Sequence, residues 1–112
     1  MQIVRVYSGD DGESHFEDLT ADQLAEIVYP VGSGAITLGR RSSPSFSDYH
    51  TAPRRQYTIT LSGEIEIGTG DGTVRRFGPG SVLLAEDLTG QGHTTRVVSQ
   101  EPRVYIVVPL GD

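Results

Sequence analysis

The sequence contains no cysteine, and all nine of its basic residues are arginine. Without cysteine the chain has no disulfide, thiolate nucleophile, iron–sulfur ligation or thiolate zinc site. Without lysine it has no amine that could form a Schiff base or act as a tuned base. General acid–base chemistry therefore falls to histidine, aspartate, glutamate and tyrosine side chains.

Long apolar runs and phosphate-binding loops are also missing. No stretch approaches the roughly 18 apolar residues of a membrane span, and no charged-then-apolar leader is seen, so we expect a cytoplasmic protein without membrane contact. The net charge of −6 argues against nucleic acid or an anionic membrane as a partner, because those contacts depend on basic patches. Arg54-Arg55 and Arg75-Arg76 are local exceptions where an acidic substrate could bind. The glycine-rich pieces at 32–34 and 68–72 have the pattern of turns, not of nucleotide-binding loops.

The 112 residues suffice for one domain with one modest core. Residues 50–93 predict four short strands separated by glycine turns, with His50 and His93 at the two ends of the stretch. Elsewhere we expect, in chain order, an edge strand at 2–7, a polar loop at 8–17, a two-turn helix at 20–28 that begins with a capping box, a strand at 35–41, a loop at 42–48, and strands at 94–98 and 104–108. His15, in the first loop, is predicted to be exposed or to lie over one end of the fold, where it is a candidate lid residue. The whole pattern predicts an all-β protein with at most one short helix.

Residues 56–61 alternate between polar and apolar side chains. Gln56, Thr58 and Thr60 fall on one face of the predicted strand, and Tyr57, Ile59 and Leu61 fall on the other, because side chains alternate with period two. The polar face either lies in solvent or lines a pocket.

Residues 34–108 resemble the cupin superfamily in two motifs. In the first, Gly63 stands at the closing glycine, which places Gln56 at the usual glutamate, Ala52 at the second histidine and His50 at the first; Pro44 stands at the opening glycine. In the second, Gly80 is the opening glycine and residues 88–93 correspond to Pro-x-Gly-x-x-His, with two extra residues between Gly80 and Leu88, leucine at 88 in place of proline, and valine at 97 in place of asparagine.

This resemblance implies a double-stranded β-helix, a jelly-roll barrel, over 34–108, preceded by an N-terminal strand and loop over 1–33. It also implies a metal bound by three histidines and a glutamate, and a tendency to form homodimers. Here Gln56 and Ala52 replace two of the ligands, so a metal is not favoured; if a divalent transition metal is bound, its ligands are His50, His93 and Gln56. Glu86 and Asp87 are possible substitute ligands.

The candidate catalytic residues are His50, His93 and Gln56. In a barrel of this type, both histidines would lie at the mouth of one pocket and act as general acid and base near neutral pH, since the ordinary histidine pKa is about 6.5. The candidate substrate-binding residues are Thr58, Thr60, Arg54, Tyr57, Glu86 and Asp87. In the alternative, both residues are structural: His50 caps a loop, and His93 forms a hydrogen bond within a turn.

Three functions remain open for this site. The first is a metal-independent lyase, isomerase or cyclase that acts on a small-molecule substrate. The second is a cupin oxygenase that depends on iron, manganese or nickel, and the third is a non-catalytic module that binds a small molecule, since a fold does not fix a function. We also expect a homodimer, which would bury the apolar face of Tyr57, Ile59 and Leu61 against its copy.

Overall fold

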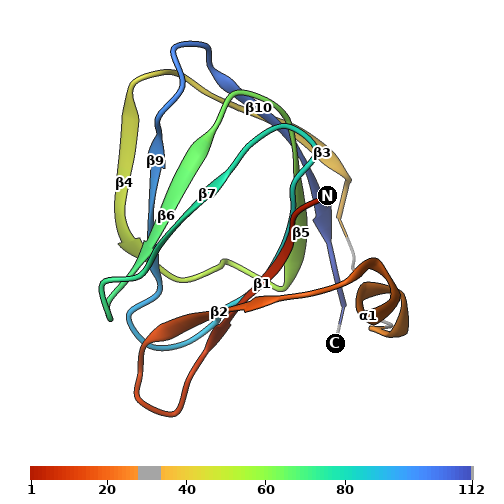
Figure 1. Ribbon diagram of the computed structural model, residues 1–112, viewed down its shortest axis with the longest axis vertical. Coiled ribbons are helices and arrows are strands. Elements are labelled where there is room, and N and C mark those ends of the chain that lie inside the picture. Colours follow the sequence, from red (N-terminus) through yellow and green to blue (C-terminus); the bar gives the residue numbers. More distant parts are fainter. Residues whose placement is uncertain (28–33, 112) are drawn as a thin grey trace.

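The computed structural model describes residues 1–27 and 34–111. They form an all-β structure with one short helix, as the sequence predicts (Figure 1). In chain order the elements are β1 (Ile3–Ser8), β2 (Ser14–Asp18), α1 (Ala21–Glu26), β3 (Thr37–Arg41), β4 (Ser45–His50), β5 (Gln56–Ser62), β6 (Ile65–Thr69), β7 (Val74–Phe77), β8 (Val82–Glu86), β9 (His93–Val97) and β10 (Arg103–Pro109). No described helix has the length and apolar character needed to cross a membrane.

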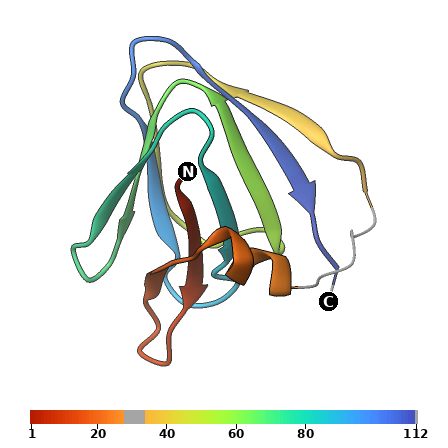
Figure 2. The same ribbon diagram turned by 45° about the vertical axis from the view of Figure 1, so that its right-hand side comes forward.

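The strands form two sheets that face each other (Figures 1 and 2). The six-stranded sheet has the order β2-β1-β8-β5-β10-β3, and the four-stranded sheet has the order β4-β9-β6-β7. Strands β1 and β8 run parallel, and every other pairing among the described residues is antiparallel. The chain passes from the larger to the smaller sheet between β3 and β4. Strand β4, which ends at His50, and strand β9, which begins at His93, are neighbours in the smaller sheet.

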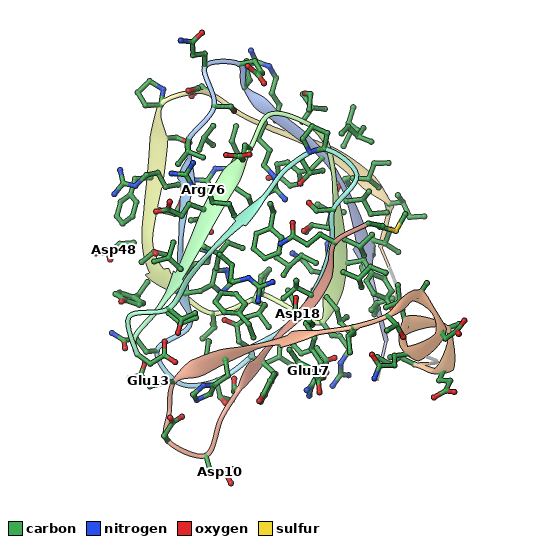
Figure 3. The ribbon with its side chains drawn as sticks, in the orientation of Figure 1. Asp10, Glu13, Glu17, Asp18, Asp48 and Arg76 are labelled. Carbon is green, nitrogen blue, oxygen red and sulfur yellow. The ribbon has the colours of Figure 1, made fainter. Side chains whose placement is uncertain are left out.

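Alternating side chains build the core between the sheets. Strand β6 shows the period most clearly, since Ile65 and Ile67 are each 1% exposed while the glutamate between them is not buried. The core cluster takes its members from both sheets: Val4, Val6, Ala52, Ile65, Ile67, Phe77, Leu83, Ala85 and Val97. Acidic side chains such as Asp10 and Asp48 lie at the periphery, in keeping with the negative net charge (Figure 3).

Two N-terminal predictions are wrong. The first strand is not an edge strand, because β1 lies between β2 and β8 and its Val4 and Val6 are fully buried. The segment predicted as a loop at 8–17 contains β2, which pairs with β1 from Ser14 to Asp18. The sequence of β2 gives no sign of a strand, because it is mostly polar and only Phe16 among its side chains packs against the apolar core cluster.

The predicted helix is confirmed, and the loop predicted at 42–48 is not. Thr20 caps α1 and accepts a bond from the backbone of Gln23, while the Gln23 side chain accepts one from the backbone of Thr20, so the capping box is present. Residue 28, the predicted end of the helix, lies outside the described residues. Strand β4 occupies 45–50 and pairs with β9, although neither of its faces is apolar enough to show a period in the sequence.

Candidate functional site

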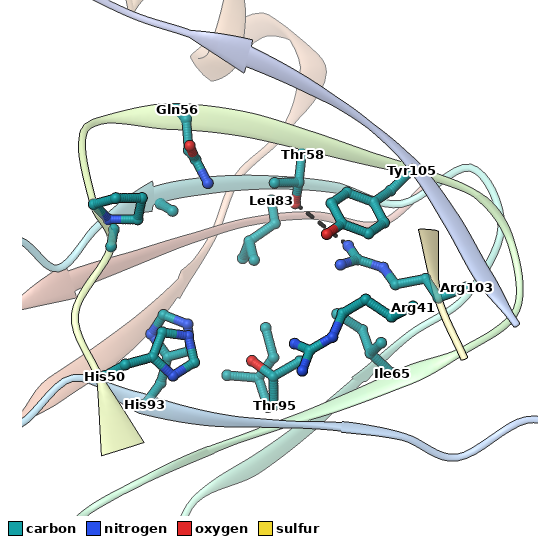
Figure 4. Close-up of a pocket in the computed structure, with 14 residues that line it drawn as sticks. Arg41, His50, Gln56, Thr58, Ile65, Leu83, His93, Thr95, Arg103 and Tyr105 are labelled. Carbon is teal, nitrogen blue, oxygen red and sulfur yellow. Dashed lines mark hydrogen bonds between the residues drawn. The ribbon is translucent and has the colours of Figure 1, made fainter. Parts of the chain in front are cut away.

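A pocket of about 120 Å³ lies between the two sheets, next to the apolar core (Figure 4). Side chains from both sheets line it: Arg41, His50, Ala52, Pro53, Gln56, Thr58, Ile65, Ile67, Leu83, Ala85, His93, Thr95, Arg103 and Tyr105. The imidazoles lie together on one side, and the guanidinium groups of Arg41 and Arg103 lie on the other. The pocket therefore has an imidazole end, a cationic end and an apolar wall contributed by the core.

The structure brings His50 and His93 together as the sequence predicts. The two residues are direct partners in the β4–β9 register, and their ring centroids lie 4.7 Å apart with a 57° tilt. His50 is exposed at the mouth, whereas His93 is 6% exposed. Gly92 allows the approach: it has a φ of +78°, and a Cβ there would lie 2.0 Å from the His50 carbonyl oxygen.

Asp87 lies behind His93 and fixes its orientation. The carboxylate is fully buried, and its Oδ2 accepts hydrogen bonds from His93 Nδ1 at 2.5 Å and from Ser14 Oγ at 2.8 Å. Because an ionised carboxylate only accepts hydrogen bonds, the proton of the neutral His93 ring sits on Nδ1 and leaves a lone pair on Nε2. The other oxygen, Oδ1, has no partner among the described residues. Asp87 is thus a positioning residue, not a residue of the pocket wall.

His50 is held in a related way by the backbone. Its Nδ1 lies 2.8 Å from the Asp48 carbonyl oxygen, an acceptor, so Nδ1 carries a proton and donates it. When the ring is neutral its Nε2 also carries a lone pair, and when the ring is protonated Nε2 becomes a donor. Two adjacent imidazoles, each with Nδ1 engaged, form a pair that can divide the acid and base roles.

The polar face of β5 points into the pocket. Gln56 and Thr58 line it, and Thr60, which is 1% exposed, lies beside them and accepts hydrogen bonds from Arg103. The alternation at 56–61 thus predicts the two faces of β5, and the reading in which the polar face lies in solvent is wrong.

Besides Asp87 and Thr60, three predicted binding residues lie outside the pocket wall. Tyr57 lies on the outer face of β5, because Thr58 next to it faces inward. Glu86 follows the pocket residue Ala85 on β8 and pairs on the outer face with Arg5 at 3.2 Å and Arg55 at 3.3 Å. Arg54 is exposed and does not line the pocket.

His15 also lies away from the pocket wall. Its Nε2 is 2.9 Å from Asp11 Oδ2, and its Nδ1 is 3.7 Å from Asp71 Oδ2. The hydrogen bond to Asp11 raises the pKa of His15, and the pKa of Asp71 is lowered to about 2, mainly by its hydrogen bond from Thr69. These contacts tie the β1–β2 turn to the β6–β7 turn, so the structure gives His15 a structural role.

The donor set does not fit the four-ligand metal site that the cupin resemblance implies. At the ligand positions of the pattern stand His50, Ala52, Gln56 and His93, and the alanine has no donor atom. Over residues 1–27 and 34–111, no group of three histidine, aspartate or glutamate side chains could hold a metal ion. Neither substitute carboxylate reaches the open space, since Glu86 faces outward and Asp87 lies behind His93.

The sequence reasoning missed the cationic end of the pocket. Arg103 is 5% exposed, and Arg41 is half-buried; with Tyr105 and Thr95 they complete the wall. The signal lies in β10, where Arg103 and Tyr105 share one face and Gly39 on β3 leaves room for the tyrosine ring. The predicted strand at 104–108 begins after Arg103 and contains only aliphatic residues and Tyr105, so its sequence did not indicate a polar face.

Comparison with the sequence profiles of known protein families and with curated proteins finds no match.

Proposed function

We propose that this protein is a small-molecule enzyme of lyase, isomerase or cyclase type, with a cupin-like double-stranded β-helix fold. In this proposal His50 and His93 transfer protons at the pocket without a metal ion. The observation that carries it is the imidazole pair at 4.7 Å, with the buried Asp87 carboxylate behind one ring. An oriented histidine backed by a carboxylate is a recurring arrangement for proton transfer.

The two imidazoles divide the work between them. His93 Nε2 removes a proton from the substrate, and Asp87 stabilises the imidazolium that forms, because its carboxylate holds the Nδ1 proton. His50, at the solvent-facing mouth, delivers a proton to the substrate or exchanges it with water. The amide of Gln56, which lines the pocket, donates a hydrogen bond in this proposal to the oxygen on which negative charge develops.

Exchange of substrate hydrogen for solvent deuterium, measured with a set of small carbonyl compounds, tests this proposal without knowledge of the reaction. The purified protein is incubated in D₂O with small carbonyl compounds, and deuterium at the acidic carbon is followed by NMR. We expect exchange with at least one compound, and a fall of about a hundredfold or more in His93→Gln and His50→Gln, the range for loss of a positioned acid or base. His15→Gln is the matched control and should keep the full rate, since His15 does not line the pocket.

Two results would contradict the proposal. One is exchange that persists in His93→Gln, and the other is the absence of exchange and turnover with every compound that binds. The second result would favour the non-catalytic binding module.

A metal-dependent oxygenase is the second candidate, and one observation favours it. Both imidazoles use Nδ1 in a hydrogen bond to an oxygen acceptor, which is how metal-bound histidines are usually oriented. Elemental analysis of protein purified without chelators decides between the candidates. We expect well below one transition-metal ion per chain; a stoichiometric metal whose removal abolishes activity would replace the first proposal by this one.

A further inference from the structure

The cationic end of the pocket contains a buried arginine without a counter-charge. Arg103 is 5% exposed, and neither it nor Arg41 forms an ion pair with any described residue. The described ion pairs of arginine all belong to other positions: Arg5, Arg55, Arg75 and Arg76. Arg103 is therefore a buried cation that points into a cavity and has no anionic partner among residues 1–27 and 34–111 (Figure 4).

Neutral groups hold the Arg103 guanidinium in place. Its Nε and one terminal nitrogen donate to Thr60 Oγ1 at 3.3 and 3.2 Å, and the same terminal nitrogen lies 3.5 Å from Thr58 Oγ1. Its Cζ lies 4.0 Å from the centroid of the Tyr105 ring. These contacts fix the orientation of the group but leave its charge uncompensated, and part of the five-donor fork stays available.

The charge persists at neutral pH. Burial lowers the pKa of Arg103 to about 10, and Arg41 nearby lowers it further in the same direction, yet that value is still far above 7. Proteins rarely bury a cation in this state, because desolvation costs free energy that only a paired anion recovers. A guanidinium kept charged, oriented and unpaired at a pocket is the arrangement expected where a ligand supplies the anion.

We propose that Arg103, with Arg41 beside it, binds the carboxylate of a small organic acid, and that this acid is the substrate class of the pocket. The assignment rests on the proposed function in one respect only, namely that the ligand is also the substrate. A planar carboxylate matches the guanidinium fork and can be held by two parallel hydrogen bonds. Arg41, whose guanidinium bonds to Ser47, adds a second positive charge.

The size and walls of the pocket limit the acid further. The volume of about 120 Å³ is somewhat below the roughly 150 Å³ of an apolar cavity known to hold benzene, so the buried part of the ligand has about the size of one small ring. Ile65, Ile67 and Leu83 form an apolar wall that suits a hydrocarbon body. With its carboxylate on Arg103, such an acid extends toward the imidazole pair.

A phosphate fits this end less well than a carboxylate. Phosphate sites commonly use backbone N–H groups at helix N-termini or in glycine-rich turns. Here the residues on both sides of the guanidinium groups are strand side chains, namely Thr58, Thr95 and Tyr105, and only one of the two cations is fully buried. One negative charge on a planar group is therefore the closest match.

Benzoate and its neutral isostere benzamide provide the direct test. Binding is measured by NMR titration of backbone amide shifts in the full chain, with butyrate and butyramide as the aliphatic pair. We expect the carboxylates to shift the amides of β5 and β10, and each amide isostere to bind at least tenfold more weakly. Arg103→Met should weaken benzoate binding at least tenfold, whereas Arg103→Lys should retain part of the affinity, because it keeps the charge but loses the fork.

The matched control is Arg40→Met, on the opposite face of the same strand as Arg41. It should leave benzoate affinity within twofold of the wild type, and Arg41→Met should reduce it. His15→Gln should also keep benzoate affinity within twofold, because His15 does not line the pocket.

Four results would overturn the inference. These are equal binding of benzoate and benzamide, tighter binding of inorganic phosphate than of any carboxylate, an Arg40→Met variant as weak as Arg103→Met, and no carboxylate binding up to about 50 mM, which is weaker than the millimolar range of poor ligands. Failure of the proposed function looks different. In that case carboxylates bind through Arg103, but no compound is turned over or exchanged, which refutes catalysis and leaves the anion site standing.

Discussion

Thr60→Val and Arg103→Met, made singly and together, test how the ligand-free protein keeps a cation in its interior. Thr60 is 1% exposed, and its hydroxyl accepts two N–H groups of Arg103. Valine has nearly the same shape without the hydroxyl, so Thr60→Val leaves Nε of Arg103 without its acceptor and the terminal nitrogen with only the 3.5 Å contact to Thr58 Oγ1. Because hydrogen bonds to charged groups are worth about 1.5–3 kcal/mol, we expect this variant to lose roughly 2–3 kcal/mol of unfolding free energy.

Arg103→Met removes the charge together with its bonds. Burial lowers the pKa of Arg103 from the ordinary value of an arginine side chain to about 10. This decrease corresponds to a cost of roughly 3 kcal/mol for the charged form, at about 1.4 kcal/mol per pKa unit. Arg103→Met removes this cost of burying the charge. It also leaves the Thr60 hydroxyl unpaired and loses the contact with Tyr105, and these two losses together cost about 2–4 kcal/mol. The opposing effects nearly cancel, so we expect a change below about 1 kcal/mol, although a charged residue has been removed from the core.

The double variant separates this explanation from ordinary packing loss. With the cation gone, the Thr60 hydroxyl has no function, and Thr60→Val in the Arg103→Met background should be neutral or stabilising. The coupling energy should be about 2 kcal/mol, measured by urea denaturation, or about 8 °C in Tm at roughly 4 °C per kcal/mol for a domain of this size. Arg40→Met is the control, with an expected change within about 0.5 kcal/mol. If the two single effects add to within about 0.5 kcal/mol, the reasoning about Arg103 is refuted.

Two further predictions concern the turns and the outer face. The hydrogen bond to Asp11 raises the pKa of His15 above its ordinary 6.5, so protonated His15 stabilises the fold in full below that value, and the stabilisation is lost as pH rises through the raised pKa. Urea denaturation between about pH 5.5 and 9 should show this loss in the wild type and not in His15→Gln; equal pH profiles would contradict it. Light scattering at tens of micromolar should give a dimer that Ile59→Glu, on the outer face of β5, converts to a monomer, while Val74→Glu, on an exposed position of the other sheet, should not. A wild-type monomer, or a dimer that survives Ile59→Glu, would show that this face is not the interface.

The sequence predicted elements whose side chains have a period and missed those without one. The alternation from Gln56 to Leu61 is the signature of a strand with one buried face, and Thr58 and Thr60 are buried as that signature requires. Strand β4 has no such period: its two aromatic residues, Phe46 and Tyr49, are both exposed, and its other members are polar. Its position is set by pairing with β9, a long-range contact that leaves no local mark.

The residues of the candidate site could also be predicted only in part. His50 and His93 could be predicted because they are rare residues at the ends of a recognisable stretch. The role of Asp87 could be named only in part, since its partner Ser14 lies on β2, a strand that the sequence did not indicate. Arg103 could not be predicted, because in a chain with nine arginines only the structure shows which one is buried without a carboxylate.

The order of strands in the larger sheet has a consequence for how the chain folds. Strand β1 is paired with β8, and β5 is enclosed between β8 and β10, so the six-stranded sheet is complete only after residues up to 109 have been synthesised. During synthesis β1 can pair with β2, but the edge of β1 that pairs with β8 in the folded sheet stays unpaired until residues 82–86 have been made. Contacts this distant in sequence place the domain among slow, millisecond-to-second folders, and we expect truncations before β10 to aggregate instead of retaining a folded N-terminal half.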